Sequence, residues 1–172
     1  MYTIAYHGDG ATPQKLAKDI GPDIKINHYW PNLNKQQALN WLIEHPTLAP
    51  FNLIGYSRGG YIITHITQTH HHLINATILY ETPVLEYNQA PGTYPVLMIW
   101  NKSKNQNKDR KNTPEGQKTI KVWSQTHPIT NLEGKGGHTR YQYWPPSIRH
   151  NWDQTLNQQI NHWLETVNLQ NI

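Results

Sequence analysis

Short apolar segments alternate with amphipathic segments along this chain of 172 residues, and this alternation limits the possible folds most strongly. Three apolar segments, at residues 51–54, 74–79 and 96–100, have the length and the continuous apolar character of strands buried on both faces. Segments with helical periodicity separate most of the expected strands. The alternation predicts an α/β fold, with a mostly parallel sheet covered by helices on both faces.

The expected elements follow the order β-α-β-α-β-α-β-β-α-β-α. We expect strands at residues 2–6, 24–29, 51–55, 77–80, 95–100 and 128–132, and helices at residues 13–20, 34–45, 114–123 and 151–168, with a further helical run after Ser57 through residues 61–66. Thr12 and Pro13 suit the cap and the first position of a helix. Neither an internal repeat nor a linker divides the chain, so we expect a single domain over residues 1–172.

Composition excludes several classes of protein. The chain has no cysteine, which excludes disulfides, thiolate zinc sites and cysteine nucleophiles. The start of the chain lacks the basic and apolar regions of a signal peptide. No stretch approaches the roughly 18 apolar residues of a membrane span. We therefore expect a soluble cytoplasmic protein without membrane contact.

The formal net charge is +4 and the sequence pI is about 9.2, which raises the question of nucleic-acid binding. Much of the basic charge, however, lies in residues 102–111, which are rich in Asn and Gln and lack apolar periodicity. We interpret this segment as a solvated surface loop and expect no nucleic-acid partner.

The sequence Gly55-Tyr56-Ser57-Arg58-Gly59 carries the strongest chemical signal. It stands between an apolar strand and a helical run, the context in which G-x-S-x-G presents an exposed serine on a strained turn. A helix N-terminus beside that hydroxyl favours a developing negative charge. The motif therefore predicts a nucleophilic serine at Ser57.

Three glycine-containing turns together resemble the α/β-hydrolase superfamily, and the resemblance covers nearly the whole chain. They are the serine motif, continued by Gly60, the pair His7-Gly8 after the first strand, and Gly136-Gly137-His138 after the last strand. The resemblance implies a three-layer αβα sandwich. It also implies a minimal core that begins at the family's third strand, with only the short segment 81–94 where larger relatives insert a lid.

The resemblance also implies roles for individual residues. His138 would be the base that activates Ser57, and the backbone N–H groups of Asp9 and Arg58 would form the oxyanion hole. His7, Gly8, Gly55 and Gly59 would support these turns. We expect the Asp9 side chain to face its own loop, because a carboxylate beside an oxyanion would be harmful.

The acid that orients the histidine is the least defined member of the site. Family members usually carry it in a Gly-x-x-Asp turn after the penultimate strand, but here Asn101 follows Trp100 and no carboxylate comes before Asp109. We favour Asp109, reached by a longer loop. Glu81 is the alternative acid, because some relatives place the acid after that earlier strand, and a dyad or a neutral partner such as Asn101 remains open.

These observations predict a serine hydrolase that cleaves a small or medium carboxylic ester, or a thioester, through an acyl-enzyme on Ser57. No cofactor and no metal is expected, since no carboxylate or cysteine accompanies the histidines from His65 to His72. Residues 141–144 could wall the site, whereas Trp152 and Trp163 suit the core. The alternative is a non-catalytic binding protein of the same fold that has lost a competent acid.

Overall fold

The computed structural model describes residues 1–82, 86–102, 109–135 and 152–169. Six strands form one sheet in the order β2-β1-β3-β4-β5-β6, and every neighbouring pair is parallel. The strands are β1 (Thr3–Tyr6), β2 (His28–Trp30), β3 (Phe51–Tyr56), β4 (Ile74–Tyr80), β5 (Val96–Lys102) and β6 (Ile129–Lys135). The predicted order of elements is confirmed.

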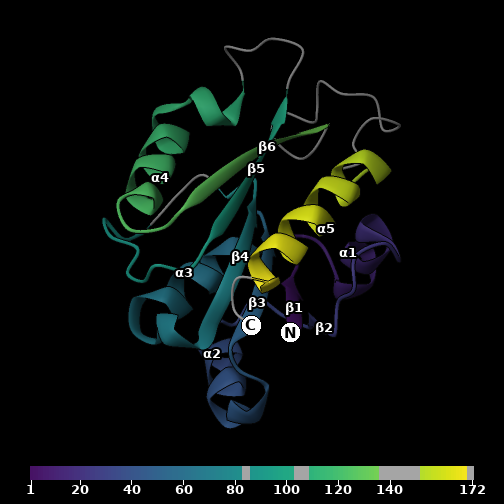
Figure 1. Ribbon diagram of the computed structural model, residues 1–172, viewed down its shortest axis with the longest axis vertical. Helices are drawn as coiled ribbons and strands as arrows, with labels where there is room; N and C mark the ends of the chain where they lie inside the picture. The colour runs from purple at the N-terminus through teal and green to yellow at the C-terminus, as the bar shows by residue number, and fades with distance from the viewer. Residues whose placement is uncertain (83–85, 103–108, 136–151, 170–172) are drawn as a thin grey trace.

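Helices cover both faces of this sheet (Figure 1). They are α1 (Pro13–Ile20), α2 (Lys35–Glu44), α3 (Gly59–His70), α4 (Pro114–Ser124) and α5 (Gln154–Leu169). Buried residues of α2, α3 and α4 join one apolar cluster, whereas buried residues of α1 and α5 join another. The fold is therefore the predicted three-layer αβα sandwich.

Strand side chains are shared alternately between the two clusters. In β5, Met98 belongs to the cluster under α2, α3 and α4, whereas the neighbouring Leu97 and Ile99 belong to the cluster under α1 and α5. This alternation follows from the pleat of a strand, in which successive side chains point to opposite faces. Because both faces are covered, the central strands β3, β4 and β5 are mostly apolar, as their sequences indicated.

Helix caps explain why the first helix begins where the sequence predicted. The Thr12 side chain accepts a hydrogen bond from the Lys15 N–H, and Pro13 occupies the first helical position. Asn34 caps α2 and Thr113 caps α4 in the same way. The last helix begins at Gln154 rather than at residue 151, because the Asp153 side chain accepts from the Leu156 N–H and caps it.

The second strand is shorter than predicted. Residues 24–27 were expected to belong to it, but β2 begins at His28. The Asn27 side chain accepts a 2.9 Å hydrogen bond from the Thr3 N–H. If the pairing of β1 with β2 continued to this point, that N–H would instead donate to a backbone carbonyl of β2. β4 and β6 are longer than expected.

Among the described residues, none of the helices combines the length and the apolar character that a membrane span requires.

Candidate active site

The carboxyl ends of all six strands lie at one edge of the sheet, because the strands are parallel. His7 and Gly8 follow β1, Ser57 follows β3, Glu81 follows β4, and Asn101 lies near the end of β5. Residues far apart in sequence therefore meet at this edge, which is where α/β sheets generally bind ligands.

Ser57 occupies a tight turn between β3 and α3. Its φ angle is 55°, in the left-handed region that residues other than glycine rarely adopt. Its N–H donates a 2.7 Å hydrogen bond to the Tyr80 carbonyl, and its own carbonyl accepts from the Gly60 N–H at 3.0 Å. The sequence motif thus adopts the strained strand-to-helix turn that it predicts.

Glycines allow the backbone segments around Ser57 to approach one another. A Cβ at Gly59 would collide with the Tyr6 carbonyl oxygen, and a Cβ at Gly55 would lie 2.6 Å from the Gly60 N. At Gly8 the nearest atom would be the Ser57 Cβ, at 3.2 Å. The loop after β1 therefore packs directly against the serine.

The His7 side chain contacts the backbone of this loop. It is buried, and its ring Nδ1–H donates a 2.8 Å hydrogen bond to the Gly8 carbonyl. This hydrogen bond links the His7 side chain to the backbone of the loop, and its role in supporting the site stays a prediction.

Asp9 directly follows Gly8, Arg58 directly follows Ser57, and the two residues lie side by side. Within the described residues, neither backbone N–H donates a hydrogen bond, so both donors are open to a ligand. The side chains form an ion pair, with Arg58 Nε 3.5 Å from Asp9 Oδ2. The expectation that Asp9 faces its own loop is wrong, because the opposite charge of Arg58 draws the carboxylate across to the neighbouring turn.

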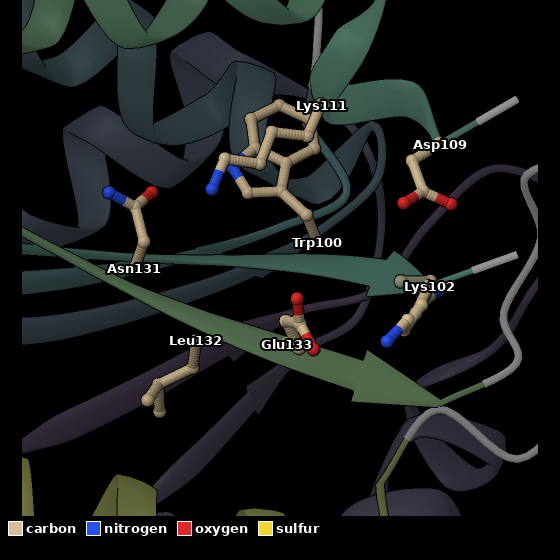
Figure 2. A pocket seen from close by; sticks show the side chains of 8 residues that line it. Trp100, Lys102, Asp109, Lys111, Asn131, Leu132 and Glu133 are labelled. Carbon is tan, nitrogen blue, oxygen red and sulfur yellow. The ribbon is translucent and has the colours of Figure 1, made fainter. Parts of the chain in front are cut away.

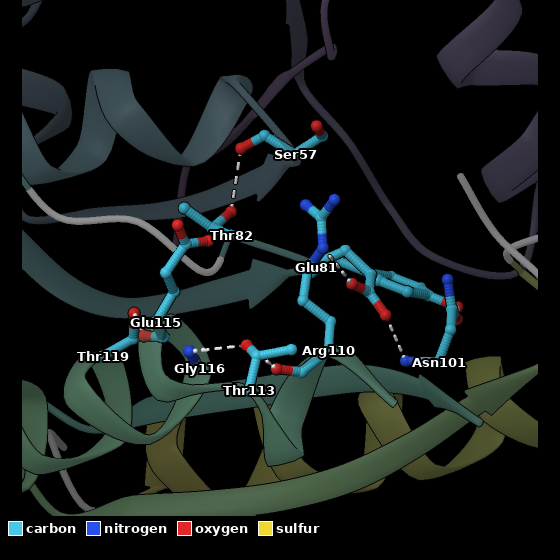
Figure 3. A network of polar contacts seen from close by, with 10 residues as sticks. Ser57, Glu81, Thr82, Asn101, Arg110, Thr113, Glu115, Gly116 and Thr119 are labelled. Carbon is cyan, nitrogen blue, oxygen red and sulfur yellow. Dashed lines mark hydrogen bonds and ion pairs between the residues drawn. The ribbon is translucent and has the colours of Figure 1, made fainter. Parts of the chain in front are cut away.

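Glu81 is fully buried at the end of β4 and, like Ser57, has a positive φ angle, of 52°. One of its carboxylate oxygens accepts a 2.5 Å hydrogen bond from the Asn101 N–H. The other lies 3.9 Å from Nε of Arg110 (Figure 3). Both oxygens are thus engaged by groups from the end of β5 and from the short 3-10 helix Arg110–Asn112.

Asp109 lies at the same edge, directly before that 3-10 helix. It is half-buried and lines a cavity of about 190 Å³ (Figure 2). The other residues that line this cavity come from β5, β6 and the 3-10 helix: Trp100, Asn101, Lys102, Lys111, Asn131, Leu132 and Glu133. Asp109 therefore lies close to the end of β5.

Asn101 is held by its neighbours rather than open to a ligand at its amide oxygen. The Tyr80 hydroxyl donates a 2.6 Å hydrogen bond to Asn101 Oδ1, and burial raises the Tyr80 pKa. A Cβ at Gly134 would collide with this hydroxyl, so β6 can pass only because glycine stands there.

Three polar residues of this edge were missed in the sequence: Tyr80, Thr82 and Arg110. Thr82 donates a 2.9 Å hydrogen bond from Oγ1 to the Ser57 carbonyl. Tyr80 and Thr82 flank Glu81 in the sequence. Their place at the end of a strand expected next to the serine strand was the signal that could have identified them. Arg110 was hidden within the basic segment that we interpreted as a solvated loop.

His138, the turn Gly136-Gly137 and residues 141–144 lie outside the described residues. The predicted base therefore stays a prediction. Among the residues that the structure does describe, no group of three or more His, Asp or Glu side chains could hold a metal ion.

No family model and no curated protein sequence matches the chain significantly. Solved structures do match. A YdeN-like hydrolase from Pectobacterium atrosepticum has a TM-score of 0.61 at 13% identity, over 96% of this chain and 91% of that one. A carboxylesterase from Mesorhizobium loti has a TM-score of 0.58 at 14% identity, over 95% and 88%.

A third similar structure is the RedJ thioesterase from the prodiginine pathway of Streptomyces coelicolor, with a TM-score of 0.59 at 9% identity, over 95% of this chain and 88% of that one. The similarity in each case extends over almost the whole of both chains. At such low identity it defines the architecture and leaves the chemistry to the site itself. The chain has the α/β-hydrolase fold.

Proposed function

We propose that the protein is a serine hydrolase that cleaves a small or medium carboxylic ester, or a thioester, through an acyl-enzyme on Ser57. The observation that carries this proposal is the backbone of Ser57. A buried strand, a left-handed serine at φ 55° and a helix that begins two residues later form the turn that exposes a nucleophile. Strain of this kind persists where function requires it.

The reaction would proceed in two steps. Ser57 Oγ attacks the carbonyl carbon while His138 takes its proton, and the bond to the alcohol or thiol breaks as His138 returns that proton to the leaving group. His138 then takes a proton from a water that attacks the acyl carbon, and it returns this proton to Ser57 Oγ as the bond between Ser57 and the acyl group breaks and the acid leaves. The open N–H groups of Asp9 and Arg58 would hold the oxyanion in both steps.

Asp109 remains our choice for the acid. Its position close to the end of β5 supports this choice, because the resemblance places the acid after that strand. Glu81 remains the alternative, but its oxygens already face Asn101 and Arg110. A carboxylate so engaged would have to share an oxygen with the histidine.

The fold neighbours add support, since two of them are a carboxylesterase and a thioesterase. One observation favours the alternative of a non-catalytic binding protein. At the end of β5 stands a neutral residue, Asn101, whose amide oxygen accepts from Tyr80.

Hydrolysis of p-nitrophenyl acetate and butyrate, and of a short acyl thioester, distinguishes the two. We expect turnover by the wild type and none above background by Ser57→Ala. Since that substitution leaves the backbone turn intact, folding can be matched by circular dichroism. Equal rates for the two proteins would favour the binding protein.

A further inference from the structure

Arg110 lies at the edge of the sheet that carries the candidate active site, beside the end of β4. It is the first residue of the 3-10 helix between β5 and α4, and its side chain is 31% exposed. In Figure 3 its guanidinium points toward Ser57, while Glu81 lies beside it. An arginine in this position would face a substrate that binds at Ser57.

The hydrogen-bonding capacity of Arg110 exceeds what its neighbours use. A guanidinium carries five N–H donors. Within the described residues, the only polar contact of this side chain is the ion pair with Glu81, and at 3.9 Å it is too long for a hydrogen bond. The terminal N–H groups therefore remain available for a ligand, whereas Glu81 fixes the direction of the side chain.

Arg58 and Arg110 both place positive charge near Tyr61. Burial raises the pKa of Tyr61, on the first turn of α3, and the charges of Arg58 and Arg110 oppose this rise. The Arg58–Asp9 ion pair is exposed at the surface, with side chains 61% and 64% exposed, whereas Arg110 is less exposed and points toward Ser57, so Arg110 is the better placed cation for a substrate group.

We propose, on the basis of the serine hydrolase function above, that the preferred substrates are esters whose acyl part carries a carboxylate, and that Arg110 binds this carboxylate. A planar guanidinium matches a carboxylate with two parallel N–H groups. The acyl part is the part that becomes bonded to Ser57, toward which Arg110 points. Glu81 acts as the positioning residue that holds the guanidinium.

Two matched substrate pairs test this specificity. The 4-nitrophenyl monoesters of glutaric and succinic acid differ from 4-nitrophenyl pentanoate and butanoate by a terminal carboxylate in place of a methyl group. We expect kcat/KM, corrected for uncatalysed hydrolysis, to favour at least one carboxylate ester by about tenfold to a hundredfold. The preference should weaken as salt is added.

Substitutions assign the preference to Arg110. In Arg110→Gln the ratio of kcat/KM for the carboxylate ester to that for its neutral partner should fall to about one. Arg110→Lys keeps a charge opposite the buried Glu81 but loses the planar fork, so this ratio should take an intermediate value. Lys111→Gln removes one positive charge from the adjacent position and should leave the ratio unchanged.

The ratio separates specificity from a general loss of activity, because a folding defect lowers both rates together. Hydrolysis of the neutral esters without any preference for the carboxylate esters would overturn the assignment of substrate class and leave the hydrolase function intact. A preference that persists in Arg110→Gln would overturn the role of Arg110. Failure to hydrolyse either kind of ester would contradict the hydrolase function itself.

Discussion

The Thr82 hydroxyl donates a 2.9 Å hydrogen bond to the Ser57 carbonyl and thereby ties the end of β4 to the serine turn. Thr82 is buried, and its side chain also fills the space in front of Gly60, where a Cβ would collide with Thr82 Oγ1. Two neighbouring strands thus fix the backbone that presents the hydroxyl.

Thr82→Val removes this hydrogen bond with almost no change in volume. We expect it to lower the free energy of unfolding by about 1 kcal/mol and kcat/KM by about twofold to tenfold, because the turn is less firmly held. Thr82→Ser keeps the hydroxyl and serves as the control, with a smaller loss of kcat/KM. Urea denaturation and ester hydrolysis measure both quantities, and equal kinetics for the two variants would argue against this role.

The left-handed backbone of Ser57 makes a second prediction, on stability. A residue with a Cβ costs roughly 1–2 kcal/mol in this conformation, whereas glycine adopts it without that cost. Ser57→Gly should therefore be more stable than Ser57→Ala by about 1 kcal/mol, although both lack the nucleophile. Thermal unfolding of the two variants checks this, and a less stable glycine variant would show that the turn is unstrained.

Asp109 and Glu81 can be separated as candidates for the acid. Asp109→Asn should lower kcat on neutral esters by a thousandfold or more, as expected when the histidine loses its orienting carboxylate. Glu81→Gln should retain most of this kcat. It should lower the free energy of unfolding by about 3 kcal/mol, because the Arg110 charge then has no carboxylate opposite it. Steady-state kinetics and denaturation of both variants give the answer, and the opposite pattern would assign the acid to Glu81.

A buried histidine far from the serine predicts how stability depends on pH. Burial lowers the pKa of His127, although its ring nitrogens lie 2.8 and 2.9 Å from the carbonyl oxygens of Tyr94 and Ala90, which act in the opposite direction. The unfolded chain therefore takes up a proton at higher pH than the folded one. The stability that the neutral ring contributes is present above pH 6.5 and is lost as the pH falls toward the folded-state pKa.

His127→Gln should reduce this acid sensitivity. We expect the difference in unfolding free energy between pH 7 and pH 5 to be smaller in the variant, by on the order of 1 kcal/mol. Denaturation at the two pH values measures it, with His162→Gln, a substitution on α5, as the control. An unchanged difference in His127→Gln would show that this ring does not titrate in the folded protein at a lowered pKa.

The sequence allowed most of the sheet and its helices to be predicted, because the central strands are mostly apolar and several helices carry their caps. The beginning of β2 was predicted wrongly, since the hydrogen bond between Asn27 and Thr3 joins residues 24 positions apart. Such a contact leaves no local periodicity to detect.

The serine turn could be predicted for a similar reason, since strand, motif and helix are contiguous in the chain. The surroundings of Glu81 could not, because Asn101 and Arg110 approach it from 20 and 29 positions away. Charge patterning alone favoured a solvated loop for the segment that contains Arg110. Only the folded structure, in which the 3-10 helix Arg110–Asn112 lies beside the end of β4, shows that this arginine faces a buried carboxylate.

Covalent labelling of Ser57 tests the central claim most directly. The intact protein is treated with a fluorophosphonate probe, which phosphonylates activated serines, and the modified peptide is located by mass spectrometry. The account predicts one labelled site, Ser57, and no labelling of the folded Ser57→Ala variant. Labelling of another residue, or of none, in a protein whose fold is intact would contradict it.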